Sequence, residues 1–296
     1  MHYALDYMMN RHITDFVIKA DGLARGKGVF IPRGESDAEG ILRALFERDA
    51  LGQAGRRVII EQKVTGTEIA VKAFTDGATV AMMPPVTDYK RLRDHDEGPN
   101  TGGMGACTPT LSDPGLLDGL RTRIIEPVLA GLHADSCAFK GVFYADVILT
   151  PDQGPLALGL NARWGDPGAQ TVLPLLETDL LAILEACIDD RLAELDVQWR
   201  EGFAASVVMA TAGYPYHSDP GLPITQSDYL PEDALLFHAG TRRAADGTLI
   251  TTGGRVVTLT ATGPNLPTAI TRVYDSVRQI HFTDAHFRTD IGAQTG

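Results

Sequence analysis

The chain has 296 residues, of which 44% are hydrophobic and 22% charged, and its formal net charge is −12. This composition is typical of a folded globular protein with one large or two medium cores, and it excludes a disordered or fibrous chain. The acidic balance excludes a general nucleic-acid binder, because binding to the phosphate backbone needs a basic surface. Three widely spaced cysteines without a C-x-x-C pair favour a cytoplasmic protein without zinc or disulfides. No apolar run approaches the roughly 18 residues that a membrane span requires, so we expect no membrane partner.

The first quarter of the chain predicts a small mixed unit. A weak helical pattern over Tyr3–Arg11 leads directly into Asp15–Ala20, which is typical of a strand. A glycine-rich loop follows at Ala20–Gly28, and apolar residues recur at helical spacing within Asp37–Asp49. Four further strands are expected at Val29–Pro32, Arg57–Lys63, Glu68–Phe74 and Thr79–Met83. Short glycine turns between the last three predict that they pair as antiparallel neighbours.

Farther along, the pattern alternates between helices and strands. Pro84–Pro109 holds too many Gly, Pro, Asn and Asp residues for regular structure, so a long functional loop is expected there. Helices are predicted over Pro114–His133 and Asp179–Leu192, with an antiparallel hairpin of Phe139–Leu149 and Leu156–Asn161 between them. After a boundary at Gln198–Gly202, we expect a β-rich end with strands at Ala204–Thr211, Ala234–His238, Gly240–Arg243, Leu249–Thr252 and Arg255–Ala261 and a helix at Leu266–Gln279.

Two lysines flank the glycine-rich loop of the first unit. Glycines let backbone N–H groups turn toward an anion, and Lys19 and Lys27 would neutralise a polyphosphate. The loop is not a P-loop, because Lys27 is followed by Gly where a Ser or Thr would bind magnesium. Glu61 and Val64 flank a segment whose backbone can pair with an adenine edge, and Glu68 can accept a ribose hydroxyl. The alternative for the loop is a surface hairpin without a ligand.

Several motifs, taken together and in this order, point to one family. They are KADGLARGKGV at Lys19–Val29, EGPNTGGMGA at Glu97–Ala106, NARWGDP at Asn161–Pro167, and HAGT and TTGGRV nearer the C-terminus. The chain resembles the phosphoribosylamine–glycine ligase family of the ATP-grasp superfamily from Tyr3 to Gly292. The second motif is the most specific, because so long and unusual a string does not arise by chance.

The resemblance implies an α+β ATP-grasp fold, in which antiparallel sheets with helices clasp a nucleotide, followed by a small β-rich domain. Expected bounds are 1–200 for the ATP-grasp domain and 201–296 for the β-rich domain. Within the first, 14–83 would clasp the nucleotide and 84–200 would hold the substrates and metal. The implied reaction uses ATP and Mg²⁺ or Mn²⁺ to phosphorylate the glycine carboxylate, and the amine of 5-phosphoribosylamine then attacks the acyl phosphate.

Family roles transfer to matching positions of this sequence. Lys19 and Lys27 would hold the nucleotide phosphates, Glu61 and Val64 the adenine, and Glu68 the ribose. The small-molecule substrates would lie against Asp88, Lys90, Asn100, Thr101, Gly102, Gly103, Met104 and Gly105. Arg163 and Asp166 would act on the acyl-phosphate and amine side, and with Lys90 they form the expected catalytic set. The alternative for Arg163 and Asp166 is a structural salt bridge at the end of a strand.

The expected metal site departs from the family pattern. The family places a Glu two residues before the Asn, where this chain has Gly159, and another Glu directly after Asp-Pro, where it has Gly168. Asp146 stands on the preceding strand, and side-chain parity across the turn allows it to face Asn161. Because Mg²⁺ needs only one or two carboxylates beside phosphate oxygens and water, Asp146 and Asn161 are the expected ligands. The alternative is a broken metal site.

Two functions follow from these observations. Family members begin with a further domain that closes over the phosphoribosylamine, so a partner chain would supply that part or the amine would differ. A carboxylate–amine ligase is favoured, because the motifs and both lysines are retained and an acid has been gained at Asp146. The alternative is a non-catalytic nucleotide-binding or assembly protein derived from such a ligase.

Overall fold

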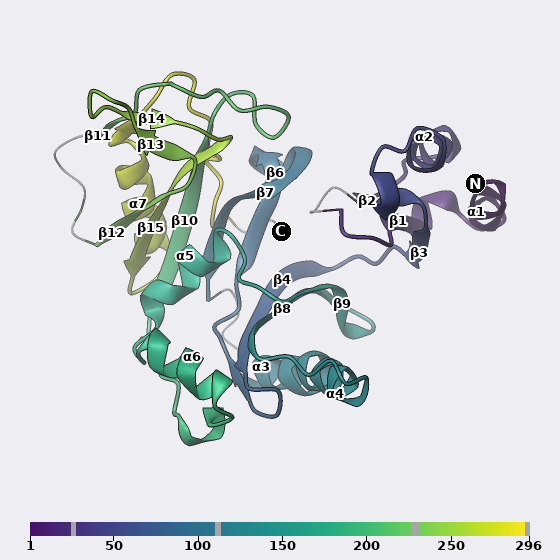
Figure 1. The fold of residues 1–296 in the computed structure, drawn as a ribbon, viewed down its shortest axis with the longest axis horizontal. Helices are drawn as coiled ribbons and strands as arrows, with labels where there is room; N and C mark the ends of the chain where they lie inside the picture. Colours follow the sequence, from purple (N-terminus) through teal and green to yellow (C-terminus); the bar gives the residue numbers. More distant parts are fainter. Residues whose placement is uncertain (25–27, 110–113, 227–230, 232, 294–296) are drawn as a thin grey trace. The chain divides into compact units, whose positions relative to one another are not determined.

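The structure, a computed structural model, describes residues 1–24, 28–109, 114–226, 231 and 233–293. It divides into two compact units, Met1–Gly66 and Thr67–Gly296 (Figure 1). The domain bounds expected from the sequence stay predictions. Within the described residues, no helix is both long and apolar enough to cross a membrane.

The Met1–Gly66 unit packs two helices on one antiparallel sheet. Its elements are α1 (His2–Met9), β1 (Phe16–Ala20), β2 (Val29–Phe30), α2 (Glu35–Phe46) and β3 (Val58–Gln62). β1 lies in the middle and pairs with both β2 and β3. α2 buries Ala38, Leu42 and Leu45, which follow one another at helical spacing, against Ile18 of β1. The helices and strands predicted for this part are confirmed, with ends shifted by a few residues.

The pairing expected between Arg57–Lys63 and Glu68–Phe74 is wrong. β3 pairs with β1, whereas the strand that follows, β4 (Thr67–Thr75), pairs with β5 (Val80–Met82) and β8 (Gly141–Thr150). Both edges of β4 are therefore filled, and Ile69–Thr75 are all buried. A short glycine turn between two strands fits a hairpin and a connection between units equally well, so the local pattern could not choose between them.

The Thr67–Gly296 unit is built on two large antiparallel sheets. The first has the order β5-β4-β8-β9, with β9 at Gly154–Asn161. The second has the order β12-β15-β10-β7-β6. Its strands are β6 (Thr87–Arg93), β7 (Glu97–Thr108), β10 (Phe203–Ala210), β12 (Ala234–His238) and β15 (Arg255–Gly263). Two small ribbons add β11 (Thr225–Gln226) with β16 (Ile280–His281), and β13 (Thr241–Arg243) with β14 (Leu249–Thr251). The predicted hairpin of β8 and β9 is confirmed.

Helices cover these sheets. They are α3 (Pro114–Leu120), α4 (Glu126–Ala134), α5 (Gly168–Val172), α6 (Leu180–Ile188) and α7 (Leu266–Val277). α3 and α4 are joined by a π-helical turn, Arg121–Ile125, so the helix predicted over Pro114–His133 is confirmed with an irregular centre. α7 lies along the second sheet (Figure 1), where Ala269, Val273 and Val277 share a core with strand residues of β10 and β15.

The long loop expected at Pro84–Pro109 is wrong, because β6 and β7 occupy most of it. Glycine in β7 serves close packing rather than a turn. A Cβ at Gly105 would stand 2.8 Å from the carbonyl oxygen of Ser206 on β10 and 2.5 Å from Ile291. Composition therefore suggested irregular backbone where the sheet requires small residues.

Candidate active site

A cluster of charged side chains lies where β4, β6 and β8 come together. β4 pairs with β8, and an isolated bridge between Ala70 and Val86 brings the start of β6 to β4. The Nζ of Lys90 lies 2.7 Å from Oδ1 of Asp146 and 3.4 Å from Oε2 of Glu68. Residues predicted from three separate segments therefore converge at one place.

Lys90 is charged in this cluster. Burial would lower the pKa of Lys90, but the carboxylates of Asp146 and Glu68 outweigh burial and raise its pKa above the ordinary value. An ammonium with 38% of its side chain exposed can still reach an anionic ligand.

Tyr144 connects the two aspartates of the cluster. Its hydroxyl lies 2.6 Å from Oδ1 of Asp146 and 3.2 Å from Oδ2 of Asp88. Burial raises the pKa of Tyr144, and the two carboxylates raise it further, so the hydroxyl keeps its single proton and donates it to one aspartate at a time. Sequence reasoning missed Tyr144, although its position two residues before Asp146 puts both side chains on one face of β8.

The structure brings Asp146 and Asn161 together. Nδ2 of Asn161 lies 3.5 Å from Oδ2 of Asp146, while Gly159 stands directly opposite Asp146 in the strand register. A Cβ added to Gly159 would meet only that Oδ2, at 3.9 Å, so the place beside the carboxylate is open. A flip of the Asn161 side-chain amide by about 180° would point its oxygen, instead of Nδ2, into this open space.

This donor set fits a magnesium ion that is completed by other ligands. Among the described residues, Oδ1 of Asp146 is engaged by Lys90 and Tyr144, whereas Oδ2 has only the long contact to Asn161. Across the described ranges, no three His, Cys, Asp or Glu side chains gather closely enough to hold a metal unaided. Mg²⁺ commonly takes one or two protein ligands and obtains the rest from phosphate and water.

The predicted substrate segment is a tightly bent part of β7. Oγ of Thr101 donates to the carbonyl of Lys90 at 2.8 Å and accepts from the backbone N–H of Gly103 at 3.0 Å. Gly103 has a φ of +119°, and a Cβ there would stand 2.7 Å from the carbonyl oxygen of Asp166. Only glycine allows this approach. Of the remaining predicted residues in the segment, Asn100 pairs with Arg91, Met104 is fully buried, and Gly105 pairs with Val207.

Arg255 fastens the same segment to the turn after β9, and sequence reasoning missed it. Its Nη1 lies 3.0 Å from the carbonyl oxygen of Asp166, 3.1 Å from that of Gly102 and 3.3 Å from that of Gly103. Nη2 lies 3.1 Å from Oδ2 of Asp166. The hydroxyl of Tyr214 accepts from the N–H of Gly102 at 2.8 Å. The TTGGRV motif contains Arg255 and could have drawn attention to it, but the motif does not indicate which residues Arg255 contacts.

Asp166 and Arg163, the two other members of the expected catalytic set, contact different partners. Asp166 forms its ion pair with Arg255 and accepts a hydrogen bond from Gln170 at 2.9 Å. Arg163 is exposed, and its guanidinium donates to the carbonyl of Trp164 at 2.7 Å. The salt bridge at Asp166 therefore involves a guanidinium from β15 rather than Arg163.

In the Met1–Gly66 unit, two of the expected nucleotide residues form an ion pair. Nζ of Lys19 lies 2.5 Å from Oε2 of Glu61, on neighbouring strands β1 and β3. Val64 is half-buried just beyond β3. Lys27 lies outside the described residues.

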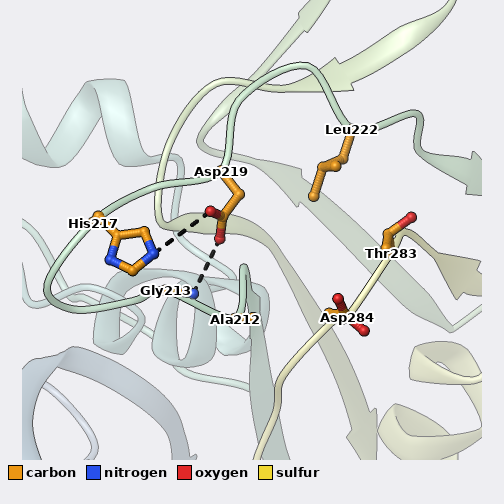
Figure 2. Close-up of a pocket in the computed structure, with 7 residues that line it drawn as sticks. All are labelled: Ala212, Gly213, His217, Asp219, Leu222, Thr283 and Asp284. Atoms are coloured by element: carbon orange, nitrogen blue, oxygen red, sulfur yellow. Dashed lines mark hydrogen bonds and ion pairs between the residues drawn. The ribbon is translucent and has the colours of Figure 1, made fainter.

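A surface pocket of about 370 Å³ lies elsewhere in the larger unit (Figure 2). Its lining residues are Ala212, Gly213, His217, Asp219, Leu222, Thr283 and Asp284. Asp219 accepts from the N–H of Gly213 at 3.1 Å and lies 3.7 Å from Nε2 of His217. The lining contains none of the predicted site residues, so the charged cluster remains the candidate active site.

Comparison with protein families identifies the family to which the chain belongs. The ATP-grasp (A) domain of phosphoribosylglycinamide synthetase matches residues 1–169, and the C domain of the same enzyme matches residues 204–294. The chain belongs to the phosphoribosylglycinamide synthetase family. The family resemblance found in the sequence is thereby confirmed.

Relatives from this family are about 40% identical to the chain. A phosphoribosylamine–glycine ligase from Caldanaerobacter subterraneus subsp. tengcongensis is 40% identical over 94% of the chain, which covers 66% of that protein. A bifunctional purine biosynthetic protein from Schizosaccharomyces pombe is also 40% identical over 94% of the chain, which covers 35% of it. The chain thus spans between about a third and two thirds of the length of these relatives.

Solved structures confirm the fold. The phosphoribosylamine–glycine ligase of Thermotoga maritima matches with a TM-score of 0.83 at 32% identity, covering 97% of this chain and 71% of that one. The biotin carboxylase domain of Hydrogenobacter thermophilus 2-oxoglutarate carboxylase, in complex with MgADP, matches with a TM-score of 0.68 at 13% identity, covering 96% and 60%. The expected α+β ATP-grasp fold with a following C domain is therefore correct.

Proposed function

We propose that the chain is an ATP-dependent carboxylate–amine ligase that joins glycine to 5-phosphoribosylamine through an acyl phosphate. The observation that carries the proposal is the convergence of Lys90, Asp146 and Tyr144 beside a glycine segment that Arg255 holds in place. Family membership supports the reaction class, because relatives of this family carry the name phosphoribosylamine–glycine ligase.

The proposed chemistry has two steps. A carboxylate oxygen of glycine attacks the γ-phosphorus of ATP, and the bond to the leaving ADP oxygen breaks. The amine nitrogen then attacks the carbonyl carbon of the acyl phosphate, loses a proton, and inorganic phosphate leaves. The ammonium of Lys90 stabilises negative charge on the oxygens in both steps, because phosphoryl transfer depends chiefly on positioning and on charge neutralisation. The segment at Gly102–Gly103 excludes water, which would hydrolyse the acyl phosphate.

The proposed nucleotide contacts follow the roles that the family resemblance implies. Lys19 and Lys27 would bind its phosphates, and Glu61 and Val64 its adenine. Glu68 touches Lys90 through Oε2 alone and is 57% exposed, so its carboxylate also suits a ribose hydroxyl. Asp88, with Asn100–Gly105, would face the smaller substrates, and Arg163 and Asp166 the amine side.

Mg²⁺ or Mn²⁺, when bound, would supply positive charge to the phosphate oxygens. Asp146 through Oδ2 and Asn161 through its amide oxygen are the residues proposed to hold it, because these atoms border the open place beside Gly159.

A hydroxylamine trap tests the first step without the phosphoribosyl amine. Hydroxylamine converts an acyl phosphate to a hydroxamate, so the purified chain with ATP, MgCl₂, glycine and hydroxylamine should release ADP and form glycine hydroxamate. Lys90→Met should lower both rates at least about 100-fold, since a charge-assisted contact is worth roughly 1.5–3 kcal/mol in the ground state and more in the transition state. Lys140→Met is the matched control, because Lys140 pairs with Asp190 outside the cluster.

Binding of ATP without any glycine-dependent ADP release would overturn the proposal in favour of the non-catalytic nucleotide-binding alternative. If ADP release does depend on glycine, a panel of amines in place of hydroxylamine identifies the second substrate. We further propose that a partner chain completes the amine site. Use of 5-phosphoribosylamine by this chain only when it is mixed with the partner would support this.

A further inference from the structure

Lys72 is a fully buried lysine next to the candidate active site. It lies in the middle of the central strand β4 with a relative exposure of 0%, directly opposite Tyr144 in the register with β8. Its Nζ has no hydrogen-bond partner among the described residues, and neither has Oδ1 of Asp88. An orphaned ammonium and an orphaned carboxylate oxygen in one buried region need an explanation, since each such group costs stability.

Two glycines make room for this ammonium. A Cβ added to Gly168 would stand 2.9 Å from Nζ of Lys72 and 3.1 Å from its Cε, and a Cβ added to Gly165 would stand 3.3 Å from Cε. The same point at Gly168 lies 3.5 Å from Oδ1 of Asp88. Lys72 and Asp88 therefore border one space, and a larger residue at position 168 would displace the end of the Lys72 side chain.

Burial opposes the charge of Lys72, and two aspartates and an aromatic ring partly offset that cost. Burial lowers the pKa of Lys72 below its ordinary value, and Lys90 lowers it further, while Asp88 and Asp146 act in the opposite direction without restoring it. Nζ also lies 4.9 Å from the centre of the Tyr144 ring, a separation at which an aromatic face attracts a cation.

Two of the three acids of the cluster each face a lysine, while the third, Glu68, is 57% exposed and shares Lys90 with Asp146. Asp146 is paired directly with Lys90, and Asp88 faces Lys72 across the place beside Gly168. These two partly buried acids therefore each face a lysine before any ligand arrives. A divalent ion entering alone would meet repulsion from both ammonium groups.

We propose that Lys72 is a resident cation of the nucleotide site, which repels free divalent metal ions so that the metal enters only together with the nucleotide phosphates. The inference rests on the proposed function in that it places the metal beside Asp146. Lys72 touches no substrate in this arrangement. It acts on the metal only through the positive charge that it places near Asp88 and Asp146. Lys72 is therefore a positioning residue and not a catalytic one.

Mn²⁺ binding to the nucleotide-free full chain tests the proposal, with free Mn²⁺ measured by electron paramagnetic resonance. Lys72→Met keeps the length of the side chain and removes its charge, so it should tighten Mn²⁺ binding at least about tenfold. Lys140→Met removes the same charge from an exposed pair with Asp190 and should change binding less than twofold. With an ATP analogue present, the parent chain should bind Mn²⁺ tightly and the difference between parent and Lys72→Met should shrink.

An unchanged Mn²⁺ affinity in Lys72→Met would overturn the proposal, because a neutral or merely structural Lys72 would not repel the metal. Tight Mn²⁺ binding by the parent chain without nucleotide would do the same. If Lys72→Met does not fold, Lys72→Gln removes the charge while retaining a polar end, and the same tightening is expected. Since the measurement needs no turnover, a chain that fails the hydroxylamine trap can still pass or fail here.

Discussion

Replacing Arg255 by Met removes the guanidinium that ties the glycine segment of β7 to the turn after β9, while keeping the unbranched apolar stem. The parent side chain is 22% exposed and its partner Asp166 is 51% exposed. The variant should lose the ion pair to Asp166 and the hydrogen bonds to the carbonyls of Gly102, Gly103 and Asp166.

The expected loss of stability can be worked from these contacts. A partly exposed ion pair contributes about 0.5–1 kcal/mol. Hydrogen bonds from a charged donor contribute roughly 1.5–3 kcal/mol each, but one nitrogen makes all three carbonyl contacts, so they count as about one. The total is about 2–4 kcal/mol, which corresponds to a fall in Tm of about 4–16 °C for a unit of this size.

Calorimetric melting of the parent and Arg255→Met proteins measures this difference. Arg278→Met is the matched control, because Arg278, directly after α7, pairs with Asp275 and the two side chains are 69% and 53% exposed. The control should change the free energy of unfolding by less than about 0.5 kcal/mol. A melting temperature for Arg255→Met that falls no further than that of the control would refute the reasoning.

Three further predictions concern the proposed metal site and the thiols. Asp146→Asn should weaken Mn²⁺ binding in the presence of an ATP analogue at least about tenfold, and an unchanged affinity would remove Asp146 from the metal site. Gly159→Glu should fold and should tighten Mn²⁺ binding, because its Cβ enters open space; a loss of several kcal/mol in melting would show instead that the place is filled. At pH 8 a disulfide reagent should modify exposed Cys137 rapidly and leave Cys107 and Cys187 unmodified, since burial raises the pKa of Cys107 to about 11 and also raises that of Cys187; rapid reaction of all three thiols would contradict the buried positions.

Local periodicity was enough to predict the hairpin that carries the residues of the proposed metal site. Alternation along Gly141–Thr150 and Gly154–Asn161 fixes which side chains share a face, so Asp146 and Asn161 were expected to lie together and they do. Helices such as α2 and α7 were predicted for the same reason, because their apolar residues repeat at helical spacing.

Contacts between distant segments left no local signal. Arg255 is 89 residues from Asp166 and 153 from Gly102, and its motif says nothing of either partner. Lys72 stands within the otherwise apolar run Ile69–Phe74, so its burial is visible in the pattern, but its neighbours Gly165 and Gly168 come from the segment beyond β9. β7 was missed because the need for glycine there arises from β10, which is about a hundred residues away.

The pairing of β7 with β10 also bears on how the chain is synthesised. On a ribosome, β7 emerges about a hundred residues before β10, and β6 can cover only one of its edges in that interval. An open strand edge invites pairing with other chains. A fragment that ends near residue 200 should therefore aggregate, whereas the chain that includes β10 and β15 can close the sheet. Contacts of such long sequence separation also slow folding, so expression at lower temperature should favour soluble protein.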